Sequence, residues 1–178
     1  MYKDTIMCRF FLLLILFVVN SKVCAEGYSY ILNDSCIKKL YTSAVNYFNK
    51  EDVDILKDPY GLILRINLPD DLEINAGIVE KFEKIKYFLA KIKNPVIIEV
   101  HVGRDFENSF KSLTKWEVST LLANKVETMI LDFDLGLDKN RLKSVGYGEF
   151  FPARNTSYNG GNYINRIDIM ILCNIIGE

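Results

Sequence analysis

The polar side chains best suited to binding chemistry surround a short apolar run near the middle of the chain. His101 stands in this run, and Arg104 and Asp105 follow it, while Arg166 opens a second apolar run near the C-terminus. Carboxylates and guanidinium groups make charge-assisted hydrogen bonds to ligand groups of the opposite charge. These side chains are therefore polar candidates for contacts to a ligand. The alternative is a solvated loop at residues 104–105 and purely structural roles for the other two side chains.

The chain offers no recognisable catalytic set. His101 is its only histidine, and no serine or cysteine has the setting of a nucleophile. It contains no glycine-rich phosphate loop, and Cys36 and Cys173 lack the spacing of metal ligands. The acidic cluster at residues 70–73 has no basic partner pattern and reads as solvated. We therefore expect a protein that is not an enzyme and that uses no cofactor or metal.

The N-terminus has the pattern of a secretory signal peptide. Lys3 and Arg9 precede an uninterrupted apolar run at residues 10–19, and Val23-Cys24-Ala25 suits a cleavage site. As a helix this run would extend roughly 15 Å, about half of the hydrocarbon core of a bilayer. We expect residues 1–25 to be a signal peptide, no transmembrane span in the mature chain, and a location in the periplasm or cell envelope. A retained membrane anchor and lipidation at Cys24 are the alternatives.

The charge of the remaining chain excludes one class of partner. Removing residues 1–25 takes away three basic residues and one acidic residue, which leaves 19 basic and 22 acidic residues and a net charge of −3. No basic block or stripe remains, so nucleic acid is not an expected partner.

Cys36 and Cys173 are the two cysteines that remain after the leader. An even pair in an exported chain favours a disulfide between the N-terminal segment and the last strand. The alternative is two buried thiols that behave as small apolar side chains.

Hydrophobic periodicity predicts four main strands, an additional hairpin strand and three helices. Residues 26–50 should form a linker and a short amphipathic helix, and residues 51–178 the domain. In the helix that follows Thr114, which has the Ser/Thr-x-x-Glu spacing of a capping box, the expected buried face is Leu121, Leu122, Val126, Met129, Ile130 and Phe133. The expected elements are a helix at 35–49, strands at 53–57 and 61–68, a loop at 69–76, and a helix that runs to about 93 with its apolar stripe from Val79 to Ile92. A strand at 95–102, the helix after 114, and strands at 141–147 and 167–173 follow. This order predicts an α+β two-layer sandwich, with helices packed on one face of a mixed β-sheet.

Several segments, taken in order, resemble the C-terminal peptidoglycan-binding domain shared by OmpA and MotB. The resemblance covers about residues 53–172. Its order and spacing are more specific than any single piece. The matching segments are Gly61-Leu62-Ile63-Leu64, Val96-Ile97-Ile98-Glu99-Val100-His101, Trp116-Glu117-Val118-Ser119, Gly146-Tyr147-Gly148-Glu149 and Arg166-Ile167-Asp168-Ile169.

The resemblance also implies where a ligand would bind. Members of this family hold the zwitterionic head of the peptidoglycan stem peptide with an aspartate after the histidine strand and an arginine on the next helix. Gly103 and Leu122 stand at these two positions here, so the usual recognition pair is absent. Asp105 lies two residues beyond the expected aspartate, which suggests a rearranged site formed with Arg104, Arg166 and His101.

These observations lead to two functional hypotheses. The first is a non-catalytic envelope protein that associates with peptidoglycan in a weakened or altered way. The alternative is an OmpA-like scaffold or adaptor that has lost this binding and contacts envelope proteins instead, with the Asn/Gly-rich stretch at residues 155–162 as an adaptable surface. The family also implies a possible homodimer.

Overall fold

The computed structural model describes residues 34–106, 112–131, 137–151 and 164–173. All of these belong to one unit of the chain, residues 32–178. The expected signal peptide, the first part of the linker, Phe133 and the stretch at 155–162 lie outside the described residues. Within the described residues, no helix is both long enough and apolar enough to cross a membrane.

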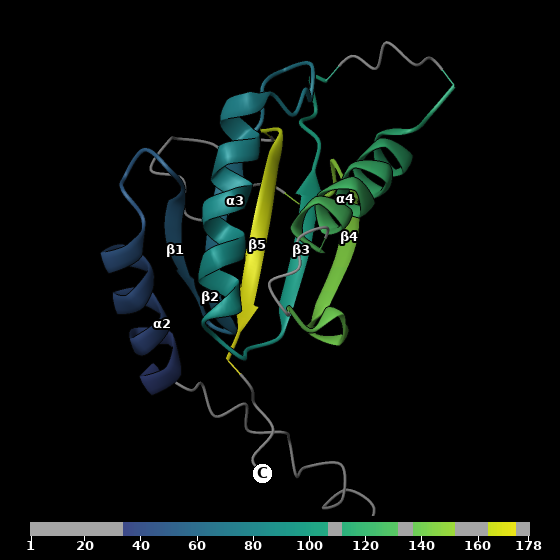
Figure 1. The fold of residues 1–178 in the computed structure, drawn as a ribbon. Coiled ribbons are helices and arrows are strands. Elements are labelled where there is room, and N and C mark those ends of the chain that lie inside the picture. Colours follow the sequence, from purple (N-terminus) through teal and green to yellow (C-terminus); the bar gives the residue numbers. More distant parts are fainter. Residues whose placement is uncertain (1–33, 107–111, 132–136, 152–163, 174–178) are drawn as a thin grey trace, which may run out of the picture. The chain divides into compact units, whose positions relative to one another are not determined.

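A five-stranded mixed sheet forms one layer of this unit (Figure 1). The strands lie in the order β1-β2-β5-β3-β4. Only the β3–β4 pair is parallel, and the other neighbours are antiparallel. The strand bounds are β1 Asp54–Asp58, β2 Gly61–Asn67, β3 Val96–His101, β4 Leu142–Gly148 and β5 Arg166–Leu172.

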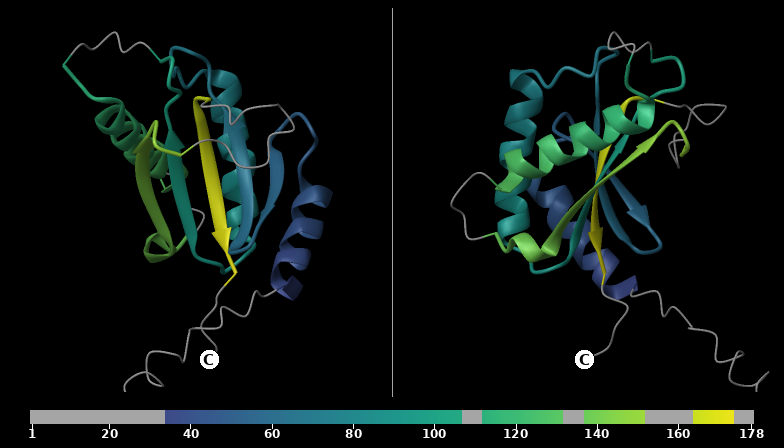
Figure 2. Two further views of the ribbon diagram at one scale, coloured as in Figure 1. Left: turned by 180° about the vertical axis from the view of Figure 1, so that it is seen from behind. Right: turned by 90° about the vertical axis from the view of Figure 1, so that its right-hand side faces the viewer.

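Three helices form the second layer, and the edge-on view shows them on one side of the sheet (Figure 2). They are α2 (Asp34–Tyr47), α3 (Ala76–Ala90) and α4 (Lys115–Leu131), with a short 3₁₀ turn η1 (Lys139–Arg141) before β4. The predicted α+β two-layer sandwich is confirmed. α3 begins at Ala76, where the expected loop ends, and the Asn75 side chain caps it by accepting from the Ile78 N–H at 3.1 Å. The helix ends at Ala90, before the expected end near residue 93.

The core lies between the helices and the inner face of the sheet. Alternate residues of each central strand point inward, as a period of two requires. These inward side chains are almost fully buried; they are Leu62, Leu64 and Ile66 of β2, Val96, Ile98 and Val100 of β3, and Ile167, Ile169 and Ile171 of β5.

A disulfide joins α2 to the chain just after β5. Cys36 and Cys173 have Cα atoms 5.9 Å apart, within the range that a disulfide spans. Ile37, Leu40 and Ala44 of α2 are buried in the same core cluster as the central strands. α2 is therefore held both by apolar packing and by a covalent link.

The capping box at the start of α4 forms as expected. The Thr114 N–H donates to a Glu117 carboxylate oxygen at 2.7 Å, and the Glu117 N–H donates to Thr114 Oγ1 at 3.2 Å. The paired contacts satisfy two of the free backbone donors at this helix end.

α4 lies very close to β4, and small residues make this approach possible. A Cβ on Gly146 would lie 2.2 Å from the backbone nitrogen of Thr120. Gly148 has a φ of +55°, and its N–H donates to Ser119 Oγ at 2.8 Å. The segments Trp116–Ser119 and Gly146–Glu149 thus dock against one another in the fold.

Because of this close approach, the buried face of α4 differs in part from the predicted one. The buried residues are Ser119, Ala123, Val126 and Ile130, whereas Leu121 is 58% exposed. Small side chains must face β4 because of the short helix–strand distance, so the apolar pattern alone pointed to the wrong side of the helix at Leu121. Leu122 and Met129 are only partly buried.

Candidate functional site

Charged side chains on the outer face of the sheet come from three neighbouring strands. Strand register places Arg65 of β2 opposite Asp168 of β5, and Asp168 opposite Glu99 of β3. In the next row, Arg166 of β5 lies opposite His101 of β3. All five alternate with core residues and therefore point away from the helices. The sheet thus brings five polar groups together on the face that no described helix covers.

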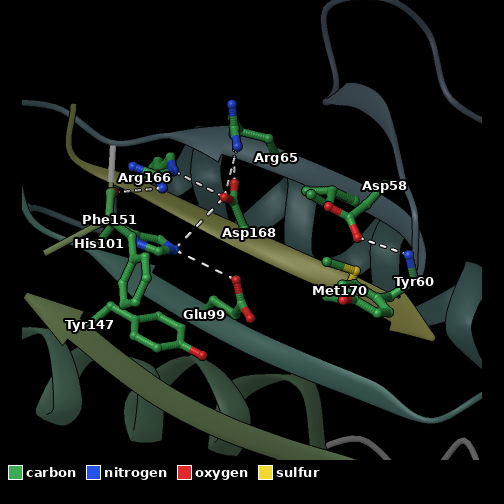
Figure 3. Close-up of a pocket in the computed structure, with 11 residues that line it drawn as sticks. Asp58, Tyr60, Arg65, Glu99, His101, Tyr147, Phe151, Arg166, Asp168 and Met170 are labelled. Carbon is green, nitrogen blue, oxygen red and sulfur yellow. Dashed lines mark hydrogen bonds and ion pairs between the residues drawn. The ribbon is translucent and has the colours of Figure 1, made fainter. Parts of the chain in front are cut away.

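Asp168 is the centre of this cluster (Figure 3). Arg65 donates to both of its carboxylate oxygens, from Nε at 2.6 Å and from Nη2 at 2.8 Å, and Arg166 Nε donates at 3.0 Å. Burial raises the pKa of Asp168, but the hydrogen bonds and charges of the two guanidinium groups outweigh it and hold the pKa below its ordinary value. Asp168 is therefore an ionised carboxylate that is fully engaged within the protein.

His101 lies beside this ion-pair cluster. Its Nε2 is 3.7 Å from a Glu99 oxygen and 3.8 Å from an Asp168 oxygen, both too long for a hydrogen bond. Burial is the main cause of the lowered pKa of His101, so its imidazole is neutral near pH 7. A register shift in the β3–β4 pair between Val100 and His101 leaves Tyr147 without a paired partner, and the Tyr147 ring stacks on the imidazole at 5.1 Å.

The five groups line a cavity of about 190 Å³, which we call the sheet-face pocket. Aromatic and apolar side chains complete its wall: Tyr60, Ile63, Tyr147, Phe151 and Met170. Asp58 lies at the opposite end from His101 and accepts from the Tyr60 N–H at 2.9 Å (Figure 3). The pocket thus combines both signs of charge with aromatic surface.

A second, larger cavity of about 820 Å³ lies where β3 ends and β5 begins; we call it the loop pocket. Asn165 organises it, since its side-chain oxygen accepts from the Gly103 N–H at 2.6 Å and its amide donates to the Pro69 carbonyl at 3.2 Å. Its lining is strongly acidic and includes Asp70, Asp71 and Asp105.

Solved structures with the same arrangement of elements identify the fold. A MotB-like protein from Desulfovibrio vulgaris matches 78% of this chain and 92% of its own, with a TM-score of 0.58 and 18% identity. The cell wall anchor of the T6SS from Pseudomonas aeruginosa matches 78% of this chain and 97% of its own, with a TM-score of 0.57 and 17% identity. The periplasmic domain of Helicobacter pylori MotB (residues 90–256) matches 66% of this chain and 77% of its own, with a TM-score of 0.51 and 20% identity.

The domain has the OmpA/MotB-like fold. No protein-family model matches the sequence, and a search of characterised proteins finds no match. The resemblance predicted from scattered motifs is thus confirmed at the level of three-dimensional arrangement.

The OmpA/MotB-like domain distributes the predicted site residues over two pockets. Gly103 and Asp105 line the loop pocket, whereas His101 and Arg166 line the sheet-face pocket. Leu122 is partly buried against the core. The structure therefore brings together Gly103 with Asp105, and His101 with Arg166, but it does not place all the predicted side chains in one cavity.

Arg104 follows Gly103 in sequence, and its backbone contacts the first residue of α4. Its carbonyl accepts a hydrogen bond from Lys115 Nζ, which also donates to a Glu149 oxygen at 2.8 Å. The Lys115 hydrogen bond is the main cause of the lowered pKa of Glu149, and the charge of Arg104 contributes to it. The positive charges of Lys115 and Arg104 therefore both act on the Glu149 carboxylate at this edge of the OmpA/MotB-like domain.

Sequence reasoning missed Arg65, Glu99 and Asp168 as members of a site. A signal was present, because each interrupts an apolar strand with a charge. On an open sheet such a residue usually faces water, so the pattern alone does not indicate a buried cluster.

Proposed function

We propose that this protein is a non-catalytic component of a bacterial cell envelope, exported through residues 1–25, whose OmpA/MotB-like domain associates with peptidoglycan in an altered way. The observation that carries the proposal is the shared cavity of Gly103 and Asp105. By the resemblance, Gly103 stands where relatives carry their ligand-binding aspartate. Asp105 supplies a carboxylate to the same cavity from two residues further along.

The charges of the loop pocket set the expected binding mode. Asp70, Asp71 and Asp105 favour the ammonium group of a stem peptide. The usual arginine position is Leu122, which offers no partner for the ligand carboxylate. Loss of one charge-assisted contact costs about 1.5–3 kcal/mol, so we expect weaker binding than in relatives with both charges.

A sedimentation assay with isolated peptidoglycan tests the proposal. We expect the purified protein to pellet with the wall and Asp105→Asn to bind at least about tenfold more weakly, since tenfold corresponds to about 1.4 kcal/mol. Glu80→Gln is the control, because this carboxylate is 71% exposed on α3, away from both pockets. Equal pelleting of Asp105→Asn and wild type would remove the loop pocket from the proposal.

A second candidate function is an adaptor that contacts other envelope proteins. Trp116 at the start of α4 is 55% exposed, and Phe150 just after β4 is 71% exposed. Exposed aromatic residues of this kind are enriched at protein interfaces. If the protein does not pellet, this candidate predicts that Trp116→Ser and Phe150→Ser disrupt a complex captured from envelope extracts. Sedimentation velocity would show whether the complex is a homodimer.

A further inference from the structure

Three buried polar atoms of the sheet-face pocket have no hydrogen-bond partner in the described parts of the chain. They are both ring nitrogens of His101 and Nη1 of Arg166. The two side chains are only 4% and 3% exposed, and they occupy directly opposed positions on β3 and β5. Buried polar atoms without a partner are rare in folded proteins, because they lose their hydration without replacement. Two of these three are donors, since one nitrogen of the neutral ring carries a hydrogen. Their convergence on one cavity indicates a ligand that supplies the missing acceptor.

The charges that remain available in the pocket define the chemistry of this ligand. Arg65 and Arg166 together occupy the Asp168 carboxylate with three hydrogen bonds. Arg166 still presents Nη1 as a donor, and Glu99 presents a partly exposed carboxylate 3.7 Å from His101. The pocket therefore offers one cationic donor and one anionic acceptor side by side.

We propose that the sheet-face pocket binds a small zwitterion of the α-amino acid type. Its carboxylate accepts from Arg166 Nη1 and from the N–H of the neutral His101 ring. Its ammonium group donates to Glu99. This site is separate from the loop pocket and does not depend on peptidoglycan binding.

The remaining walls suit such a ligand. Tyr147 stacks on His101, and Phe151 meets Tyr147 edge-on with ring centroids 4.9 Å apart. Aromatic faces attract an ammonium group through the ring quadrupole. Met170 and Ile63 add apolar surface for a short side chain. The volume of about 190 Å³ is well above the roughly 10–15 Å³ that a single water needs on the same measure.

A divalent metal ion fits the same residues less well. Ligand atoms of Glu99, His101 and Asp168 lie within 4.8 Å of one another. However, both Asp168 oxygens already accept hydrogen bonds from guanidinium groups, so the carboxylate has little capacity left for a metal. A dication would also lie beside two positive charges in a buried site, where repulsion is poorly screened. An ammonium group that contacts Glu99 avoids both difficulties.

The single histidine makes the test direct, because imidazole signals in an NMR spectrum come from His101 alone. We would titrate the full chain with alanine and follow these signals. Propionate and ethylammonium, which each carry one of the two charges, are the ligand controls. We expect saturable shifts with alanine and at least about tenfold weaker binding of either analogue.

Matched variants locate the binding. Glu99→Gln should weaken the binding of alanine at least about tenfold and leave the binding of propionate unchanged. Asp105→Asn, in the loop pocket, should change neither. We expect alanine to bind at least about tenfold more tightly than alanyl-alanine, whose two charges lie on different residues. Equal binding of the two would contradict a ligand of the α-amino acid type.

Two outcomes would overturn the proposal. One is the absence of any saturable shift with alanine in a sample whose amide spectrum shows a folded protein. The other is saturable binding of Zn²⁺, but not of alanine, at the His101 signals. Because peptidoglycan pelleting is scored with Asp105→Asn and alanine binding with Glu99→Gln, failure of one proposal leaves the other testable.

Discussion

Asp168→Asn should be among the most destabilising isosteric changes in this domain. The substitution keeps the shape of the side chain but removes the charge that two buried guanidinium groups share. Removing one partner of a buried ion pair typically costs about 3–5 kcal/mol, because the remaining charge stays buried without compensation. Domains of this size are stable by about 5–15 kcal/mol in total, so the loss is a large fraction of the whole.

Urea denaturation measures this loss directly. With a slope of about 2 kcal/mol per molar urea, the midpoint for Asp168→Asn should fall by about 1.5–2.5 M. Glu80→Gln breaks only an exposed contact to Lys84 at 3.2 Å and should change stability by less than about 0.5 kcal/mol. If the two variants shift the midpoint equally, the ion-pair cluster does not stabilise the fold.

The unfolding free energies of wild type and Asp168→Asn, measured over a range of pH, separate the effect of the lost charge from that of the changed side chain. The pKa of Asp168 in the folded state is held below its ordinary value of 3.8. Its contribution to stability is therefore fully present above that value and is lost as pH falls through the lower folded pKa. The difference between wild type and Asp168→Asn should shrink below about pH 4. A difference in unfolding free energy that stays constant from pH 7 to pH 3 would show that the substitution destabilises the domain for steric reasons and not through the lost charge.

Three further predictions concern other parts of the structure. Burial lowers the pKa of His101 below 6.5, so near pH 6 the unfolded chain binds a proton that the folded chain does not bind. Stability should therefore fall as pH drops below about 6.5, by up to about 1.4 kcal/mol per pH unit. His101→Gln should flatten this pH dependence in urea titrations from pH 8 to pH 5. The Cys36–Cys173 disulfide closes a loop with a sequence separation of 137, and its reduction should lower stability by about 2–5 kcal/mol. A Cys36→Ser/Cys173→Ser variant that unfolds at the same urea concentration as the oxidised wild type would contradict this. Gly146→Ala would place a Cβ 2.2 Å from the α4 backbone and should cost at least about 1–3 kcal/mol, measured as a lowered thermal midpoint against the solvent-exposed control Glu80→Gln.

The sequence was sufficient for most of the architecture because local patterns decide it. Alternation identified the central strands, and the Thr114–Glu117 spacing located the start of α4. The end of α3 was placed near residue 93, whereas the helix ends at Ala90, because the apolar stripe continues to Ile92 although the Lys91 N–H already bonds back to the Phe88 carbonyl. Boundaries of this kind depend on a single hydrogen bond, which periodicity does not report.

The candidate site was much harder to predict, because it depends on strand register. Arg65 and Asp168 are 103 positions apart in sequence, and only the order β2-β5-β3 brings them together with Glu99. A charge on the outer position of a strand has the same local pattern whether it faces water or a buried partner. Its partners can be named only after the neighbouring strands are known.

Three small residues of the motifs that revealed the fold hold the fold together in this chain. Ser119 and Gly148 share a hydrogen bond, and Gly146 leaves space for α4. None of the three lines either pocket. These three residues therefore argue for architecture, while ligand recognition has to be argued from Asp105 in the loop pocket and Glu99 in the sheet-face pocket. The two binding proposals consequently stand or fall on different side chains, although both rest on the same scaffold.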